Sequence, residues 1–164
     1  MKKLILFALS ITLLLSGCSS DKTGNFQLYL TDQPIPDIEN VYVTISEIGV
    51  KKQGEEAFTT IWEGEKTYDL LTLRNREERI LDIELEQGTY TQIKIVVESA
   101  AIVIRGQTFE LSIPSIAVII PVVFTIMEDG VTEVVLDFEA DNSIDIDGLS
   151  YILRPVITVE RIGY

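Results

Sequence analysis

The chain has 164 residues, with 26 acidic and 13 basic side chains, one cysteine and no histidine. The absence of histidine excludes Ser-His-Asp and Cys-His catalysis and the commonest zinc sites. The net charge of −13 disfavours nucleic acid as a partner, because a polyanion repels an acidic chain. No phosphate-binding loop or dinucleotide fingerprint is present, so no cofactor is expected.

The first twenty residues predict a bacterial lipoprotein signal. Lys2 and Lys3 precede an apolar run over 4–15, which is shorter than the about 20 residues that span a bilayer. The run ends in LSGC, which fits the lipobox pattern, in which the thiol of Cys18 is acylated and the chain is cut before it. The alternative is an ordinary secretory signal with an incidental cysteine. We expect a signal peptide over 1–17 and lipid attachment at Cys18.

The expected lipid places the protein in the cell envelope, with a flexible tether over 18–25 and one folded domain over 26–164. Ser19 follows the cysteine where an aspartate would favour retention at the inner membrane. We therefore predict the outer membrane for a Gram-negative host and the outer face of the cell membrane otherwise. Removal of the first 17 residues leaves 11 basic and 26 acidic side chains, a charge that favours solubility.

Alternation of polar and apolar residues, or β-branched enrichment, predicts short strands along the rest of the chain. They lie at 26–31, 40–51, 57–62, 79–85, 90–98, 101–105, 108–113, 117–126, 132–138 and 152–161. Glycine-containing turns separate many of them, and an acidic, proline-rich corner at 32–37 joins the first two. Segment 67–79 is ambiguous, since it fits a strand or one helical turn followed by a charged loop. About ten strands predict an all-β domain, a single Greek-key β-sandwich of immunoglobulin-like or transthyretin-like type.

A leucine, a glycine three residues on and a tyrosine two further resemble the tyrosine corner of Greek-key sandwiches. These are Leu85, Gly88 and Tyr90. In such a corner the tyrosine hydroxyl binds a nearby backbone group. The alternative is a tyrosine that only begins a strand.

Segment 114–127 is the most apolar stretch after the signal, and Pro121 interrupts it. Because proline donates no backbone hydrogen bond, the segment is predicted to be a core strand that is kinked or displaced to a sheet edge. The functional alternative is an apolar edge that faces a partner, with Pro121 and an outward Val123 as its centre.

Acidic residues over 141–148 partly fit a calcium loop. Ser143, Asp145, Asp147 and Gly148 have the spacing of an EF-hand, beside Asp141. The twelfth position is Arg154, where a calcium loop needs glutamate, and no helices are predicted around it. We therefore expect a solvated acidic turn without a metal, and keep Asp141, Asp145 and Asp147 as weak candidates.

Aromatic residues offer a second type of site, a platform for sugars. Tyrosines 29, 42, 68 and 151 and Trp62 lie on or near predicted strands, where aromatics usually fill the core. Trp62 precedes a charged turn, which allows a position at the rim of the sandwich.

Seven stretches occur in an order that resembles the bacterial and archaeal family DUF 4382. They are YLTDQP, VYVTISEIGV, DLLTL, GTYTQIKIVV, LSIPS, VVLDFEADNSI and YILRPVI, between about Phe26 and Glu160. The chain departs from the expected pattern in turns, at Gln33 and at Glu86-Gln87. The resemblance implies a secreted or lipid-anchored β-sandwich of unknown function, with no catalytic residues to transfer.

Together these features predict an envelope lipoprotein whose sandwich is a non-catalytic binding or assembly module at the membrane surface. The expected partners are the membrane, through the lipid, and an envelope protein or glycan. Two alternatives remain open, a carbohydrate-binding module and a glycoside hydrolase with paired carboxylates.

Overall fold

A computed structural model describes residues 22–32, 38–74, 76–147 and 150–164, with no side-chain account for 146 and 147. Cys18, the signal segment and most of the acidic corner lie outside the described residues. The strands are β1 (Thr23–Thr31), β2 (Asn40–Lys52), β3 (Thr59–Asp69), β4 (Glu78–Glu86), β5 (Gly88–Ile104), β6 (Gln107–Glu110), β7 (Ala117–Ile126), β8 (Val131–Phe138), β9 (Ile144–Asp147), β10 (Ser150–Leu153) and β11 (Ile157–Gly163). Two short helical turns accompany them, η1 (Leu70–Leu73) and α1 (Ala140–Ser143).

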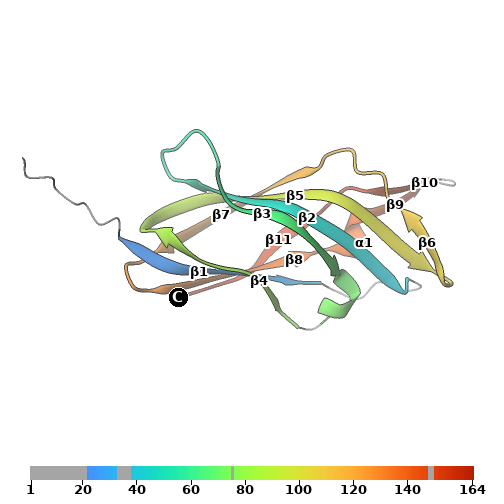
Figure 1. The fold of residues 1–164 in the computed structure, drawn as a ribbon, viewed down its shortest axis with the longest axis horizontal. Coiled ribbons are helices and arrows are strands. Elements are labelled where there is room, and N and C mark those ends of the chain that lie inside the picture. Colours follow the sequence, from blue (N-terminus) through green and yellow to red (C-terminus); the bar gives the residue numbers. More distant parts are fainter. Residues whose placement is uncertain (1–21, 33–37, 75, 148–149) are drawn as a thin grey trace, which may run out of the picture.

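The strands form two sheets that pack into a sandwich (Figure 1). The four-stranded sheet has the order β11-β8-β1-β4, with β1 antiparallel to β4 and parallel to β8. In the five-stranded sheet the order is β3-β2-β5-β6, and β7 also pairs with β5. A separate β9–β10 ribbon lies at one end.

The core follows from the alternation along the strands, because successive side chains point to opposite faces of a sheet. In β1 the side chains of Phe26, Leu28 and Leu30 are fully buried, and those between them are partly exposed. The chain crosses between the sheets from β1 to β2, from β3 to β4, from β4 to β5 and from β7 to β8, as in Greek-key sandwiches. The predicted all-β sandwich is confirmed.

Several strand boundaries differ from the predicted ones because pairing extends past the local pattern. β1 begins at Thr23, inside the expected tether, where Asn25 N donates to Gly130 O at 2.8 Å. β3 continues to Asp69 along β2 although its outward residues are charged and exposed. The predicted strand 152–161 is two strands, β10 and β11, separated at 154–156.

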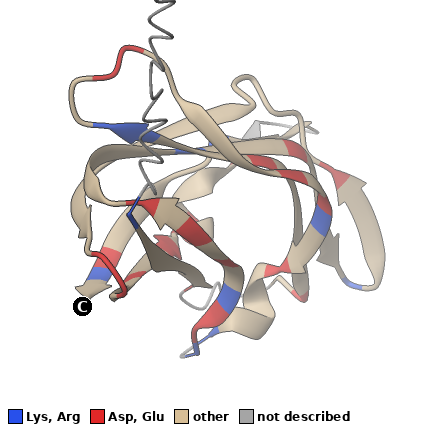
Figure 2. Cartoon of the chain, turned by 60° about the vertical axis from the view of Figure 1, so that its left-hand side comes forward, with Lys and Arg blue, Asp and Glu red and all other residues tan. Residues whose placement is uncertain are grey.

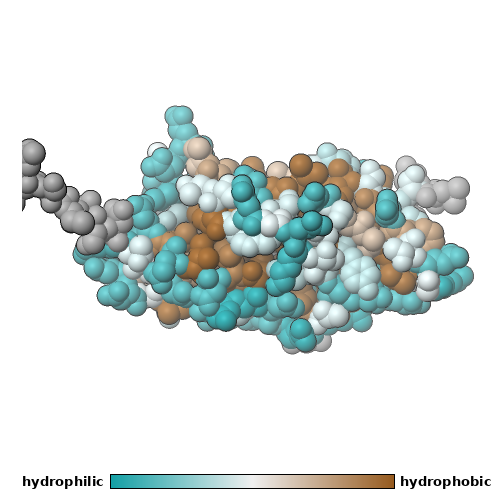
Figure 3. Space-filling view, in the orientation of Figure 1, coloured by the Kyte–Doolittle hydropathy of each residue, from teal (hydrophilic) through white to brown (hydrophobic). Residues whose placement is uncertain are grey.

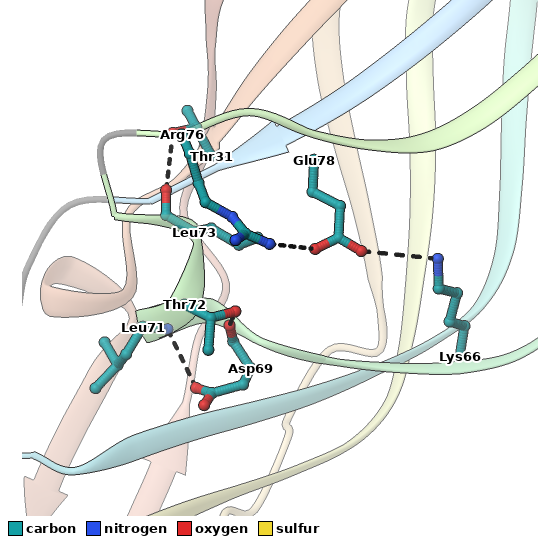
Figure 4. A network of polar contacts seen from close by, with 8 residues as sticks. All are labelled: Thr31, Lys66, Asp69, Leu71, Thr72, Leu73, Arg76 and Glu78. Atoms are coloured by element: carbon teal, nitrogen blue, oxygen red, sulfur yellow. Dashed lines mark hydrogen bonds and ion pairs between the residues drawn. The ribbon is translucent and has the colours of Figure 1, made fainter.

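In the ambiguous segment 67–79, β3 ends at Asp69 and the helical turn η1 follows it (Figure 4). The three leucines of η1 are buried. The Asp69 side chain accepts from Leu71 N at 3.2 Å, and the Thr72 hydroxyl donates to Asp69 O at 2.7 Å. Asp69 thus satisfies donors at the start of the turn, as an N-cap does. Beside it, Glu78 lies between Lys66 and Arg76, at 3.9 and 3.6 Å, and links the ends of β3 and β4.

The two ends of the sandwich differ in their relation to the tether. The start of β1 lies at the left end in Figure 1, while β6, β9 and β10 lie at the right end. Lys22 O accepts from Gln87 N at 2.7 Å, and Thr23 O accepts from Asp129 N at 3.0 Å. The chain segment that leads to Cys18 therefore enters between the β4–β5 corner and the β7–β8 turn, which we call the anchor end.

Candidate functional site

A bulge interrupts the pairing of β5 in the five-stranded sheet. The register with β2 shifts between the pairs Thr44–Ser99 and Ile45–Val97, which leaves Glu98 as the extra residue. Val97 N donates to Ile116 O at 2.7 Å on one side of the bulge, and Leu111 N donates to Ala100 O at 2.9 Å on the other. At this point β5 exchanges β7 for β6 as its neighbour. Bulges of this kind re-aim side chains and interrupt pairing.

A groove of about 420 Å³ opens at this exchange. We call it the bulge groove, and its main lining residues are Tyr42, Thr44, Glu98, Ser99, Ala101 and Glu110. The segment between β6 and β7 adds three apolar side chains to the lining, those of Leu111, Ile113 and Ile116. Two carboxylates therefore face a groove that also carries an aromatic ring and small residues.

The strand register explains the shape of the bulge groove. Ala101 pairs with Tyr42 on β2 and with Glu110 on β6, so the three residues form one row across the sheet. Neighbouring strands lie about 4.8 Å apart, which places the small alanine between two larger side chains. Thr44, which is buried, shares a hydrogen bond of 2.8 Å with the Thr67 hydroxyl. The Tyr42 ring is 36% exposed, so it is accessible from solvent.

Two further hollows flank an aromatic pair beside the bulge groove. The rings of Phe109 and Tyr151 have centroids 4.9 Å apart, and both side chains are partly buried. One hollow is lined by Glu39, Ile104, Arg105 and Gln107 and by the two rings. The other is lined by Thr108, Glu110, Ser112 and Ser150 as well as by the same two rings. Glu110 lines this hollow and the bulge groove, so the two are neighbours. The strands β6 and β10, which carry residues of this hollow, lie away from the anchor end (Figure 1).

The outward face of β7 forms a second surface of interest, which we call the β7 row. Ile119 and Val123 are 52% and 66% exposed, and Pro121 between them is also exposed. Their neighbours Ile120, Val122 and Phe124 are buried, so both faces of this strand are apolar. β7 pairs only with β5 among the described residues, and its register shifts beside Pro121. The prediction of an edge strand around Pro121 is confirmed.

Trp62 lies on β3, the edge strand opposite β7 in the same sheet. It pairs with the buried Ile48, packs against the core and is only partly exposed. Its indole ring lies over Gly64, where a Cβ would come within 2.8 Å of the ring. Seen in the orientation of Figure 1, the molecular surface has hydrophobic areas between hydrophilic margins (Figure 3). Trp62 therefore contributes mainly to packing and does not stand out as a platform.

The residues predicted to form a tyrosine corner have the required geometry. The Tyr90 hydroxyl donates to Glu86 O at 3.0 Å, across the crossing from β4 to β5. Gly88 between them has φ +151°, and a Cβ there would meet the Lys52 side chain at 2.6 Å. Burial of the phenol raises the pKa of Tyr90 above its ordinary value, against the opposing effect of Lys52. The hydroxyl is thus kept neutral as a donor.

Tyr90→Phe is expected to lower the free energy of unfolding by about 1 kcal/mol, and more if Glu86 O stays buried without a partner. Chemical denaturation of the soluble domain would measure it. Tyr164→Phe is the matched control, because that tyrosine is 67% exposed at the C-terminus. Equal, negligible losses in both variants would mean that Tyr90 only begins a strand.

In the acidic segment, the described residues 141–145 do not have the arrangement of a calcium loop. Ser143 is buried, and its hydroxyl donates to Glu139 O at 2.7 Å and accepts from Val156 N at 2.8 Å. Asp141 is exposed on α1, and Asp145 on β9 forms an ion pair with Arg154. The side chain of Asp147 lies outside the described part. Within that part, no group of three or more acidic residues is placed to hold a metal ion.

Millimolar calcium is expected to move the melting temperature little, because ligand stabilisation grows only as RT ln(1 + [L]/Kd). Arg154 occupies the carboxylate of Asp145 and adds a positive charge where a cation would bind. A thermal melt with and without calcium tests this. A shift of many degrees that disappears in the Asp145→Asn, Asp147→Asn double variant would establish a calcium site instead.

The sequence contained only part of the signal for the bulge groove and the hollow beside it. Tyr42 and Tyr151 were candidates as aromatic residues, whereas Glu98, Glu110 and Phe109 had no motif to mark them. The predicted break between strands 90–98 and 101–105 falls at the bulge, where the structure has one continuous strand. That break was the available sign of an irregular position in a central strand.

No helix in the described part is long and apolar enough to cross a membrane. Searches among curated proteins and among solved structures found no match to the chain. A model of the prokaryotic membrane lipoprotein lipid attachment site matches residues 1–19, which include Cys18. The lipid anchor and the membrane association that it provides are thereby supported. The model of a domain of unknown function, DUF4382, matches residues 23–155, and the chain belongs to that family.

Proposed function

We propose that this protein is a non-catalytic binding or assembly module, held at the envelope membrane by its lipid, that contacts an envelope protein through the β7 row. The observation that carries the proposal is the run of outward apolar residues, Ile119, Pro121 and Val123, on an edge strand. Single exposed apolar residues are ordinary, but consecutive ones on the same face are typical of an interaction site.

The surroundings of the β7 row fit a protein partner. A hollow of about 310 Å³ adjoins Ile119 and is also lined by Pro114, Val118 and Pro155. Ser115 and Arg154 line it too, so a partner side chain would meet a mainly apolar recess with one cationic side chain. Burial of such surface stabilises a complex by roughly 25 cal/mol per Å². On the neighbouring strand Lys94 is opposite Ile119 and pairs with Glu47 at 2.6 Å, so the row has a polar border. An apolar centre with a polar rim is the usual form of a protein interface.

The tether supports a location close to the membrane. Cys18 precedes the first residue of β1 by five positions, a distance of at most about 18 Å for an extended chain. We further propose the outer membrane in a Gram-negative host and the outer face of the cell membrane in other hosts, because Ser19 follows the cysteine. Acidic positions occur on strands of both sheets, which suits a soluble domain above an anionic surface (Figure 2).

Val123→Glu is expected to abolish capture of an envelope protein while the domain keeps its fold, because the side chain is exposed and a charge there would be buried by the partner. Crosslinking in the native envelope, followed by pull-down and mass spectrometry, measures it. Val131→Glu is the matched control, an exposed valine on β8. The proposal fails if Val123→Glu retains the same crosslinked protein as the wild type, or if the control loses it equally.

The glycoside-hydrolase alternative has a specific candidate pair. Glu98 and Glu110 line one groove, as two catalytic carboxylates would. The proposed non-catalytic role predicts that oligosaccharides stay intact with the wild type. Release of reducing ends that disappears in Glu98→Gln or Glu110→Gln would favour the enzyme.

A further inference from the structure

We propose that the bulge groove binds a chain of uncharged sugars. The site goes beyond the proposed function, since it lies on different residues from the β7 row and requires no protein partner. It combines an exposed ring, two carboxylates, hydroxyls and a small-residue floor in one groove.

The polar groups of the bulge groove select a ligand that donates hydrogen bonds. Carboxylates at Glu98 and Glu110 only accept, whereas the Ser99 hydroxyl both donates and accepts. No basic side chain lines the groove, so a phosphate, sulfate or uronate would be left without a counter-charge. A ligand that is rich in hydroxyl groups and free of negative charge is complementary to this lining.

The apolar groups select a flat ligand. The Tyr42 ring stands at one side of Ala101 and Glu110 at the other, so a ligand that lies over Ala101 contacts both. The face of an aromatic ring is electron-rich and packs against polarised C–H groups, which line the faces of pyranose rings. Hydroxyls at the edge of the same ring then point toward the carboxylates. A sugar thus matches both halves of the groove.

The length of the site favours a chain over a single sugar. Glu110 connects the bulge groove to the hollow beside Phe109 and Tyr151, where Thr108, Ser112 and Ser150 supply further hydroxyls. An aromatic group with polar neighbours therefore recurs farther along the surface. Both hollows lie near β6, away from the anchor end, so a polymer in the envelope can reach them without passing the membrane (Figure 1).

Calorimetric titration of the full-length lipoprotein, in a detergent without sugar headgroups, tests the proposal. The probes are tetrasaccharides of N-acetylglucosamine, of β-linked glucose and of galacturonate. We expect one of the two uncharged tetrasaccharides to bind and galacturonate not to bind. Tyr42→Ala should weaken binding by about tenfold, and Ala101→Leu, which fills the floor, should abolish it.

Two matched variants separate a groove contact from general effects. Tyr42→Phe keeps the ring and should bind the tetrasaccharide like the wild type. Tyr164→Ala removes an exposed tyrosine outside the groove and should also leave binding unchanged. Equal melting temperatures confirm that each variant is folded. The proposal is overturned if no uncharged tetrasaccharide binds at millimolar concentration, if galacturonate binds as well as they do, or if Ala101→Leu binds unchanged.

Discussion

Cys18→Ala is expected to abolish lipid anchoring completely. The lipid attachment site covers residues 1–19, and Cys18 is the only thiol in the chain, so no second residue can take the acyl groups. The variant should appear in the aqueous phase, or uncut with its signal still attached. The expected change is all-or-none.

Detergent phase partition and mass spectrometry of the N-terminal peptide measure the anchor. The wild-type peptide should carry the added mass of several acyl chains, because one chain binds a membrane only marginally. Ser20→Ala is a matched control two positions away that should partition like the wild type. Recovery of an unmodified N-terminus that begins at residue 18 in the wild type would contradict lipidation.

The predictions from sequence succeeded where local chemistry decides the structure. The alternation over 117–126 gave the bounds of β7 as they are found, and the proline within it predicted an edge strand. The tyrosine corner also depends on few neighbouring residues, since Tyr90 binds a carbonyl only four positions before it. Features that depend on short-range hydrogen bonds and backbone restrictions can therefore be predicted from neighbouring residues in the sequence.

The bulge groove could not be predicted because its residues meet only through strand pairing. Tyr42, Ala101 and Glu110 come from three strands, and their row depends on the register that the bulge at Glu98 sets. Similarly, the spacing of 143–148 along the chain matches a calcium loop. However, β10 pairs with β9, and Arg154, which directly follows β10, forms an ion pair with Asp145. Spacing along the chain does not show which residue lies opposite on the neighbouring strand.

Phe124→Ala is expected to cause the largest loss of stability. The ring is fully buried and stacks on Phe26 at 5.1 Å and on Tyr90 at 5.2 Å, so it joins β7 to strands of both sheets. Replacement of a buried phenylalanine by alanine costs about 3–5 kcal/mol, against roughly 5–15 kcal/mol for the whole stability of a domain. The variant should be at or near the limit of folding.

Urea denaturation of residues 21–164 measures this loss as a lower midpoint at an unchanged slope. Phe124→Leu retains most of the buried volume and should lose clearly less. Phe109→Ala is the second control, since that ring is only partly buried at the far end of the sandwich and removal should open no enclosed cavity. If Phe124→Ala lost no more stability than Phe109→Ala, the three stacked rings would not be the central contact between the sheets.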